Sequence, residues 1–586
     1  MSGDKTTERA RVLRSIPILA GLVGAVLLAG GVVLALYSQF VAAPIPVPFN
    51  GPYAEASDFP FRLVRGTLIF ASAAALVGGV VLVLGRRGDE RAVSVGAGGV
   101  LAILFVLGFG LLFAVTADVP STYRRLTGDY IVTPRVPSAI AALVLVVLGA
   151  VLMFVFVAKP TGQVPRRSAL AMAVVVGVVP VLGAAGVTAS VGNDSVSIDH
   201  VTAAARPEAP APAALGSEKY RLQLPVDPDF TNRIVVTRTG FVVSTPEGLS
   251  QYDGATGAER WHFRRGDARS DKVRNRHAET TYLRAEDVVL TNWRNIGWIA
   301  FDANTGEKLW TGEDFARDSR SVADGHMLVT VSERGQVTRY DARSGREMWT
   351  IPGESGQCTT SHRRVVAAMT AIYRAASCGE GEAATVVVTA FDPKSGELRD
   401  QRSFPTPRLE PIYGVSIRVF DSGFVWVQGQ RAEVNTDILL PPDQPLAAAL
   451  VDSNRTNSKV HATDRTAALV SAHDPDWQPM PGRGWPERWE VLSAAGAVST
   501  ELEMSTLTSS EQMVDAATLL ADQAVTLAWD DGFALRTWDR STGRESRVVP
   551  VTIEQSRSLR FATTSGSLVL IVTDHQDRDI EIIGFG

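Results

Sequence analysis

Cysteine is nearly missing from this sequence. Only Cys358 and Cys378 occur among its 586 residues, too few for a framework of several disulfides or for a four-cysteine zinc site. The eight histidines show no close pair with metal-ligand spacing. The sequence therefore predicts no metal site, and the two cysteines are expected to form either one structural disulfide or two free thiols.

Asp, Glu, Lys, Arg and His are missing from five long apolar segments in the first third of the chain. Each segment has about 20 residues, the length that an α-helix needs to cross the hydrocarbon core of a membrane. A helix that is apolar on every face is rarely found in a soluble domain. The sequence predicts five transmembrane helices at Ile16–Tyr37, Thr67–Gly85, Val93–Val115, Ser138–Val157 and Ala169–Val191.

The lack of charge inside these segments also bears on their function. Transporters and proton relays keep ionisable groups at membrane depth, so the bundle is interpreted as an anchor. Small residues four apart let helix backbones approach closely. They occur in two of the segments, as Gly21, Ala25 and Ala29 in the first and as Ala71, Ala75 and Gly79 in the second.

Basic residues outside the segments predict the orientation, because they are enriched in cytoplasmic loops. With the N-terminus inside, ten basic residues are cytoplasmic and five lie in the outer loops. Five crossings then place everything after Val191 outside the cytoplasm. We expect a multi-pass protein of a bacterial cell membrane. Its cytoplasmic basic residues are Lys5, Arg9, Arg11, Arg14, Arg86, Arg87, Arg91, Lys159, Arg166 and Arg167.

The chain divides into three parts by composition. Residues 1–191 form the helical part, residues 192–217 an Ala- and Pro-rich linker, and residues 218–586 a polar β-rich part. The first part has 15 Lys and Arg against 8 Asp and Glu, and the rest has 42 against 54, a net charge of −12. Phosphate backbones repel such an acidic domain, so nucleic acid is not an expected partner. The alternating Ala and Pro of the linker predict an extended spacer.

A repeat fills the β-rich part. Its clearest copies are YDGATGAERW at 252–261, FDANTGEKLW at 301–310 and YDARSGREMW at 340–349, with shorter copies at 391–396 and 538–543. Each copy has an aromatic residue, an aspartate, two variable residues, Ser or Thr, and then glycine. The aspartates are Asp253, Asp302, Asp341, Asp392 and Asp539, and the glycines are Gly257, Gly306, Gly345, Gly396 and Gly543.

This spacing is typical of a β-hairpin. The aspartate closes the turn by accepting backbone N–H bonds, and the glycine supplies the positive φ that the turn needs. Eight residues after the aspartate, Trp261, Trp310 and Trp349 are placed to pack on the neighbouring unit. We therefore interpret the aspartates as turn-forming residues rather than calcium ligands.

The pattern resembles the pyrroloquinoline-quinone-like β-propeller repeat. The resemblance covers about residues 219–586 and implies an all-β propeller after an all-α transmembrane bundle. Strand pairs beginning near Phe241, Val288, Met327, Val366, Phe424, Ala467, Val525 and Leu568 predict eight four-stranded blades, with seven as the alternative. The last blade has three strands, and EKYRLQLP at 218–225 is predicted to complete it and close the ring.

Two functions follow from this resemblance. The first is a membrane-anchored, extracytoplasmic propeller that binds or organises a protein partner in the cell envelope, without a cofactor or catalytic residues. The second is a membrane-bound quinoprotein dehydrogenase, which requires pyrroloquinoline quinone and calcium. The vicinal cysteine pair of many quinoproteins is missing, because Cys358 and Cys378 lie 20 residues apart. A sensor that couples propeller and helices is a third reading.

Two irregular stretches interrupt the repeat, at 430–449 and 473–488. Long loops in compact domains are often functional. Trp477 and Trp485, which lie between prolines, are interpreted either as a partner-binding surface or as side chains that fold back on the ring.

Overall fold

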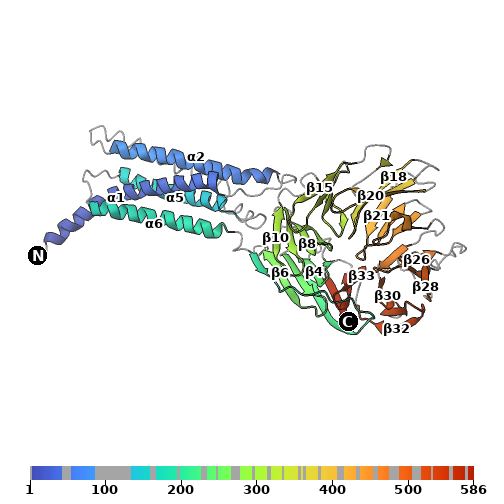
Figure 1. The fold of residues 1–586 in the computed structure, drawn as a ribbon. Coiled ribbons are helices and arrows are strands. Elements are labelled where there is room, and N and C mark those ends of the chain that lie inside the picture. Colours follow the sequence, from blue (N-terminus) through green and yellow to red (C-terminus); the bar gives the residue numbers. More distant parts are fainter. Residues whose placement is uncertain are drawn as a thin grey trace, which may run out of the picture. The chain divides into compact units, whose positions relative to one another are not determined.

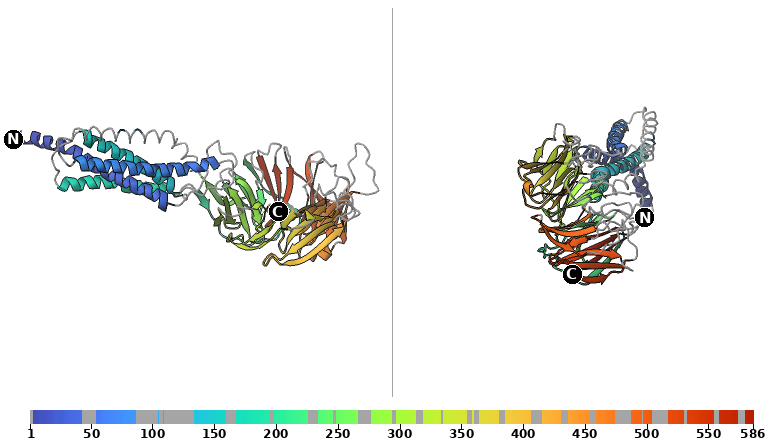
Figure 2. Two further views of the ribbon diagram at one scale, coloured as in Figure 1. Left: turned by 90° about the horizontal axis from the view of Figure 1, so that it is seen from above. Right: turned by 90° about the vertical axis from the view of Figure 1, so that its right-hand side faces the viewer.

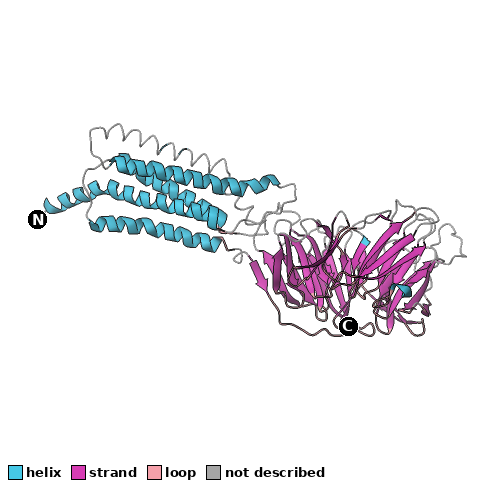
Figure 3. Cartoon of the chain, turned by 45° about the horizontal axis from the view of Figure 1, so that its top comes forward, coloured by secondary structure: helices cyan, strands magenta, loops and turns pink. Residues whose placement is uncertain are grey.

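The structure, a computed structural model, describes most of the chain. The described residues are 3–42, 54–85, 104, 108, 133–158, 167–193, 198–225, 234–245, 248–265, 277–293, 297–312, 319–332, 335–353, 358–359, 364–379, 385–405, 415–429, 436–452, 459–473, 487–495, 497–503, 517–529, 532–553, 558–573 and 579–586. Helices make up the N-terminal unit, and the C-terminal unit consists of strands (Figure 3).

Four long helices are described in the N-terminal unit. They are α1 (Gly3–Leu36), which continues into one π-helical turn η1 (Tyr37–Val41), α2 (Ala54–Gly85), α5 (Arg135–Ala158) and α6 (Arg167–Val191). Each contains a stretch of 18 to 26 residues that is long and apolar enough to cross a membrane. The described residues thus contain four such helices, not the five predicted. The predicted span Val93–Val115 lies outside them, apart from Leu104 and Gly108.

Small residues bring the backbones of the described helices together. A Cβ added at Gly24 of α1 would meet the carbonyl oxygen of Gly149 of α5 at 2.8 Å. In α2, Ala71 is buried and Gly78 packs on Leu28 of α1, whereas no described residue lies within 4 Å of a Cβ added at Gly79. A helix with 3.6 residues per turn returns to the same face after seven residues rather than eight.

Eight antiparallel sheets form the C-terminal unit, which confirms the predicted eight-bladed propeller (Figures 1 and 2). In blades 1 to 4 the four strands, in chain order, are β3 (Ile234–Val236), β4 (Gly240–Thr245), β5 (Gly248–Asp253) and β6 (Glu259–Arg265); β7 (His277–Leu283), β8 (Val288–Trp293), β9 (Gly297–Asp302) and β10 (Lys308–Gly312); β11 (Ser319–Val322), β13 (Val329–Ser332), β14 (Val337–Tyr340) and β15 (Glu347–Ile351); and β17 (Val365–Ala367), β18 (Ile372–Cys378), β19 (Thr385–Phe391) and β20 (Leu398–Pro405).

Blades 5 to 8 repeat the arrangement. Their strands are β21 (Val415–Val419), β22 (Val425–Gly429), β23 (Thr436–Leu440) and β24 (Leu450–Asp452); β25 (Lys459–Thr463), β26 (Ala467–His473), β27 (Glu487–Ser493) and β28 (Val498–Leu502); β29 (Ala517–Leu519), β30 (Gln523–Trp529), β31 (Phe533–Asp539) and β32 (Glu545–Pro550); and β33 (Ser558–Thr564), β34 (Ser567–Thr573), β35 (Asp579–Phe585) and β2 (Glu218–Pro225).

The ring closes as predicted, because β2 pairs antiparallel with β35 over its whole length, from Glu218↔Phe585 to Pro225↔Asp579. The first and last blades therefore lie side by side (Figure 1). The hydrophobic core lies between blades: one cluster, for example, joins Val388 of blade 4 to Val427 of blade 5. Because the ring is closed, the first blade packs against the last one.

Two segments differ from their sequence interpretation. Within the predicted linker, β1 (Ile198–Val201) adds a fifth strand to the outer edge of blade 1, beside β6. Part of the stretch 430–449 is regular: it contains β23 and the short 3₁₀-helix η4 (Leu446–Ala448). Both were taken for irregular chain because neither carries the repeat motif.

A turn of blade 3 contacts three other blades. The two-residue strand β12 (Asp324–Gly325) pairs in parallel with β17 of blade 4. The next residue, His326, donates its backbone N–H to Ala367 of blade 4 and accepts from Ala285 of blade 2. Its ring Nε2 lies 2.9 Å from the carbonyl oxygen of Phe420 in blade 5. One residue thus bridges blades 2, 4 and 5.

Candidate functional site

The five repeat turns share one geometry. In each, Oδ1 of the aspartate accepts the backbone N–H groups two and three residues further on. For Asp302 these are Asn304 at 3.1 Å and Thr305 at 2.9 Å. The glycine that follows has φ between 69° and 75° in all five turns. The hydrogen bonds lower the pKa of Asp392 to about 2. These aspartates close turns, because their oxygens are directed at their own backbone.

The three predicted tryptophans join each blade to the next. The indole N–H of Trp261 donates to the carbonyl oxygen of Ala303, that of Trp310 to Ala342, and that of Trp349 to Pro393, at 3.0, 2.7 and 3.1 Å. The acceptor is always the residue directly after the turn aspartate of the next blade. The ring lies against the turn glycine of that blade, where an added Cβ would stand 2.5 to 3.0 Å from the indole.

Other residue types make the same contact at further interfaces, and sequence reasoning missed them. The hydroxyl of Tyr220 in β2 donates to Gly254 of blade 1 at 2.8 Å. Thr500 of blade 6 donates to Arg540, at 2.6 Å. In blade 7, Arg547 stands eight residues after Asp539, but it donates to the carbonyl oxygen of Leu215 in the segment before β2, at 3.2 Å, and not to a turn of the next blade. The spacing of the repeat marks the position of Arg547, which could have been found from the sequence. Tyr220 could not, because it lies hundreds of residues before the other strands of blade 8.

The interface between blades 4 and 5 departs from this rule. Asp400 stands eight residues after Asp392, where the tryptophan would be. Its Oδ2 accepts the backbone N–H of Leu446 at 2.9 Å. The donor role passes to Arg402, two residues further along β20, which donates to the carbonyl oxygen of Leu446 at 3.0 Å.

A hollow of about 350 Å³ lies at this interface and opens to solvent. Blade 4 contributes most of its walls, and the loop after β23 contributes the rest. Asp400, which stands at the tryptophan position of the repeat and has a much smaller side chain than an indole, lines the hollow. The lining residues are Thr370, Ala371, Tyr373, Ala390, Arg399, Asp400, Asp443, Gln444, Pro445 and Leu446.

Carboxylates dominate the charge of the hollow. Arg399 forms an ion pair with Asp392 and donates to the carbonyl oxygen of Thr370 at 2.5 Å. Burial raises the pKa of the neighbouring Tyr373, and the nearby Asp443 adds to the shift. Asp443 has φ 60°, a left-handed conformation that few non-glycine residues adopt. The hollow is therefore lined by both polar and apolar side chains, and its carboxylates make it acidic.

Comparison with known proteins decides the repeat family. Residues 249–418, which run from blade 1 into the first strand of blade 5, match the family model of the outer membrane protein assembly factor BamB. This stretch belongs to the pyrroloquinoline-quinone-like repeat family. Among curated proteins, none matches the chain.

Several solved structures are similar to this propeller. BamB from Moraxella catarrhalis has 13% identity and a TM-score of 0.36, and the match covers 63% of this chain and all of that one. A quinohemoprotein alcohol dehydrogenase from Comamonas testosteroni has 11% identity and a TM-score of 0.32, over 63% of this chain and 76% of that one. The computationally designed Ika8 protein has 14% identity and a TM-score of 0.34, over 65% and 98%.

Residues 203–217, which we call the strap, precede the first blade of the propeller. The strap contacts blades 2, 1, 8 and 7 in turn. The backbone N–H of Arg206 donates to the side-chain oxygen of Asn304 in blade 2, and its backbone carbonyl oxygen accepts from the side-chain NH2 of Asn304. The guanidinium of Arg206 forms an ion pair with Asp253 of blade 1. Pro210 accepts from Gly566 of blade 8. Ala213 then accepts from Asp522 of blade 7. The Ala- and Pro-rich sequence is therefore packed on the propeller through these contacts.

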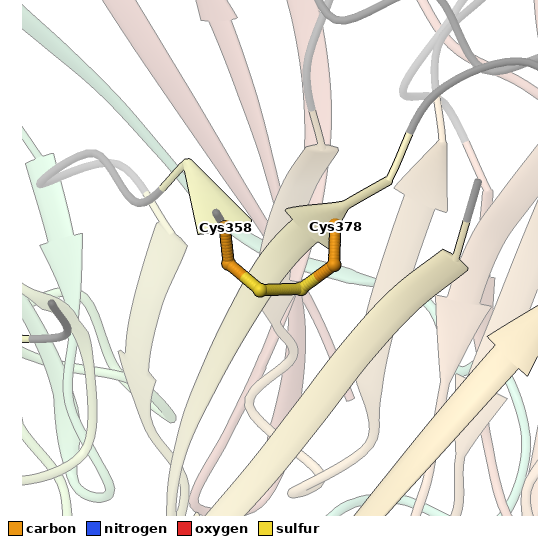
Figure 4. The surroundings of a disulfide bond; sticks show 2 residues. All are labelled: Cys358 and Cys378. Carbon is orange, nitrogen blue, oxygen red and sulfur yellow. A yellow bond between two sulfur atoms is a disulfide. The ribbon is translucent and has the colours of Figure 1, made fainter. Parts of the chain in front are cut away.

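The two cysteines form a disulfide between β16 (Cys358–Thr359) and β18 of blade 4 (Figure 4). They face each other directly in the antiparallel pairing. The bridge holds the edge of blade 4 and leaves no vicinal pair to pack on a quinone.

Trp477 and Trp485 lie outside the described residues, as does most of the stretch 473–488. Their interpretation as a partner surface stays a prediction. Among the residues that the structure describes, no three His, Cys, Asp or Glu side chains gather into a site that could hold a metal ion.

A serine and a histidine side chain contact each other in blade 6. The Nε2 of His461 lies 2.7 Å from the Oγ of Ser471, and its ring stacks on Trp489 at 4.0 Å. Burial, together with Lys459, lowers the pKa of His461 to about 3. Such a histidine is a poor general base near neutral pH, and Ser471 is buried. The pair therefore stabilises blade 6 and is no candidate for nucleophilic catalysis.

His461 should make the propeller sensitive to acid. Its folded-state pKa lies below the ordinary value near 6.5, so the unfolded chain binds more protons between pH 6.5 and 3. Stability is then constant above about pH 6.5 and falls below it. His461→Phe keeps a ring on Trp489 and cannot titrate. Between pH 7.5 and 5.5 the variant should lose about 1 kcal/mol less unfolding free energy than the wild type.

Urea unfolding of the full chain in detergent at both pH values measures this difference. All 11 tryptophans follow residue 260, so their fluorescence reports on the propeller alone. Burial also lowers the pKa of His326, but this histidine is common to both proteins and cancels in the comparison. If wild type and variant lost the same unfolding free energy, the acid sensitivity could not be assigned to His461.

Proposed function

We propose that this chain is an anchored, extracytoplasmic propeller that binds a protein partner in the cell envelope of a bacterium. The observation that carries the proposal is the match of residues 249–418 to the BamB family model, since that protein is described as an assembly factor. The four apolar helices support the anchor. The acidic propeller disfavours nucleic acid as a partner.

The quinoprotein alternative fits the described residues poorly. A quinone site of this kind needs a calcium ion and flat groups against the cofactor. The described part of the chain gathers no carboxylate cluster for a cation. We therefore assign no catalytic residue and no cofactor.

The orientation can be tested with single added cysteines, because the two native ones are joined in a disulfide. Ser217→Cys lies at an exposed position after the last helix, and Gly88→Cys lies in the basic segment after the second. A membrane-impermeant maleimide applied to intact cells should label the first and not the second. Labelling at Gly88→Cys alone would place the propeller in the cytoplasm.

Partner binding can be tested by photo-crosslinking. A benzoylphenylalanine at Leu398, which is 58% exposed on blade 4, is compared with one at Leu182, which is 65% exposed on α6. In membranes, position 398 should give a discrete protein adduct that position 182 does not.

Titration of the purified full chain with pyrroloquinoline quinone and calcium should give no saturable absorbance and no dye reduction with sugars or alcohols. Stoichiometric binding with turnover would establish the dehydrogenase instead.

A further inference from the structure

We propose that the hollow between blades 4 and 5 receives a tryptophan side chain, presented by an extended segment of the partner protein with a basic residue beside it. This inference rests on the proposed protein-binding function and names the chemistry that its site would recognise.

The interfaces between blades 1 to 4 provide a precedent for an indole packed between blades. At three consecutive interfaces an indole lies between the outer strand of one blade and the turn of the next, with its N–H bonded to a backbone carbonyl. The interface between blades 4 and 5 follows directly after these three, and Asp400 takes the place of the tryptophan. The space that remains, about 350 Å³, is at the lower end of the range for small-molecule pockets. An indole from a partner would place in this hollow the same kind of ring that packs at the three preceding interfaces.

The second argument is charge. The carboxylates of Asp400 and Asp443 line the hollow, while Arg399 is already engaged by Asp392. The Asp400 carboxylate accepts one backbone N–H through Oδ2. A lysine or arginine next to the entering tryptophan would meet these carboxylates, whereas a glutamate would be repelled.

The third argument is access for an extended chain. Strand β20 is the outer strand of blade 4 and pairs with β19 on one side. In the sheet order of the described residues, β20 stands at the edge. A strand edge offers unpaired backbone groups to an incoming segment. This molecule already uses such an edge once, because β1 pairs with the outer strand β6 of blade 1.

The probe for the test is a short peptide, acetyl-Gly-Lys-Trp-Lys-Gly-amide, with 5-fluorotryptophan. Its ¹⁹F line should broaden on addition of the full chain in detergent. The unlabelled tryptophan peptide should reverse the broadening at concentrations at least tenfold lower than a Lys-Leu-Lys or a Glu-Trp-Glu analogue requires. Equal competition by the leucine or the glutamate peptide would overturn the proposal.

Asp400→Trp places an indole of this chain at the position that the repeat assigns to one. We expect it to weaken peptide binding at least tenfold, while Gln401→Trp, on the exposed neighbouring residue, leaves binding unchanged. Wild-type affinity in Asp400→Trp would also overturn the proposal. If Asp400→Trp does not fold, the double variant Asp400→Asn/Asp443→Asn keeps the hollow and removes the charge. It should lose the preference for lysine over glutamate beside the tryptophan, and a retained preference would refute the charge argument.

Binding of a partner protein and binding of a tryptophan in the hollow can be tested separately. A crosslinked partner at Leu398 without any binding of the tryptophan peptide would refute the hollow and leave the protein-binding function standing. Loss of that partner adduct in Asp400→Trp, together with unchanged unfolding by urea, would support both.

Discussion

Gly306→Ala is expected to destabilise the propeller by about 2–6 kcal/mol, through the strained backbone conformation and through overlap with one neighbouring indole. Gly306 has φ +74°, and a Cβ at this position would stand 2.5 Å from Cγ of Trp261, which is fully buried. A non-glycine residue in this conformation costs about 1–3 kcal/mol. Overpacking a well-filled core costs about 1–3 kcal/mol more.

Gly566→Ala is the matched control. Gly566 also has φ +74°, but its added Cβ would meet only Ala255, at an ordinary 3.8 Å. It should therefore show the backbone cost alone, about 1–3 kcal/mol. The difference between the two variants, measured by urea unfolding with tryptophan fluorescence, isolates the seating of Trp261 against the turn. Equal losses would show that the indole does not rest on Gly306.

The repeat made the turns and the blades predictable, because both depend on residues close together in sequence. An aspartate that bonds the backbone two and three residues on, followed by a glycine at positive φ, needs no distant partner to be understood. Asp302 and Gly306 are an example, and the structure places both as expected. The closing strand at 218–225 was also predictable, since the last blade lacked a fourth strand.

The strap and the hollow depend on contacts that leave no periodic pattern. Ala- and Pro-rich chain predicts an extended backbone with free hydrogen-bonding groups, but its composition does not tell which surface those groups meet. Pro210 and Ala213 meet blades 8 and 7, more than 300 residues away in sequence. Asp400 was visible in the sequence as a departure from the repeat. What could not be foreseen is that Arg402 takes over the hydrogen bond and leaves the space open.

Tyr220→Ala is expected to weaken ring closure by about 3–5 kcal/mol, the usual range for removing a large aromatic side chain from a packed site. Tyr220 takes the place of the docking tryptophan in the closing blade. Its ring lies against Gly257 of blade 1 and Gly584 of blade 8, where added Cβ atoms would stand 2.6 and 2.2 Å away. Burial raises the pKa of Tyr220, so its hydroxyl remains a donor to Gly254 at neutral pH.

Two further variants separate the ring from the hydroxyl. Tyr220→Phe keeps the packing and should cost no more than about 1 kcal/mol, because the carbonyl oxygen of Gly254 also accepts from Ser567. Tyr220→Trp supplies the ring and N–H donor of the other interfaces, and it should be less destabilising than Tyr220→Ala. Urea unfolding of the full chain gives the energies, and limited proteolysis reports whether β2 leaves the last blade. If Tyr220→Ala behaved like Tyr220→Phe, backbone pairing of β2 with β35 would be sufficient to close the ring, and the aromatic contact would have no part in it.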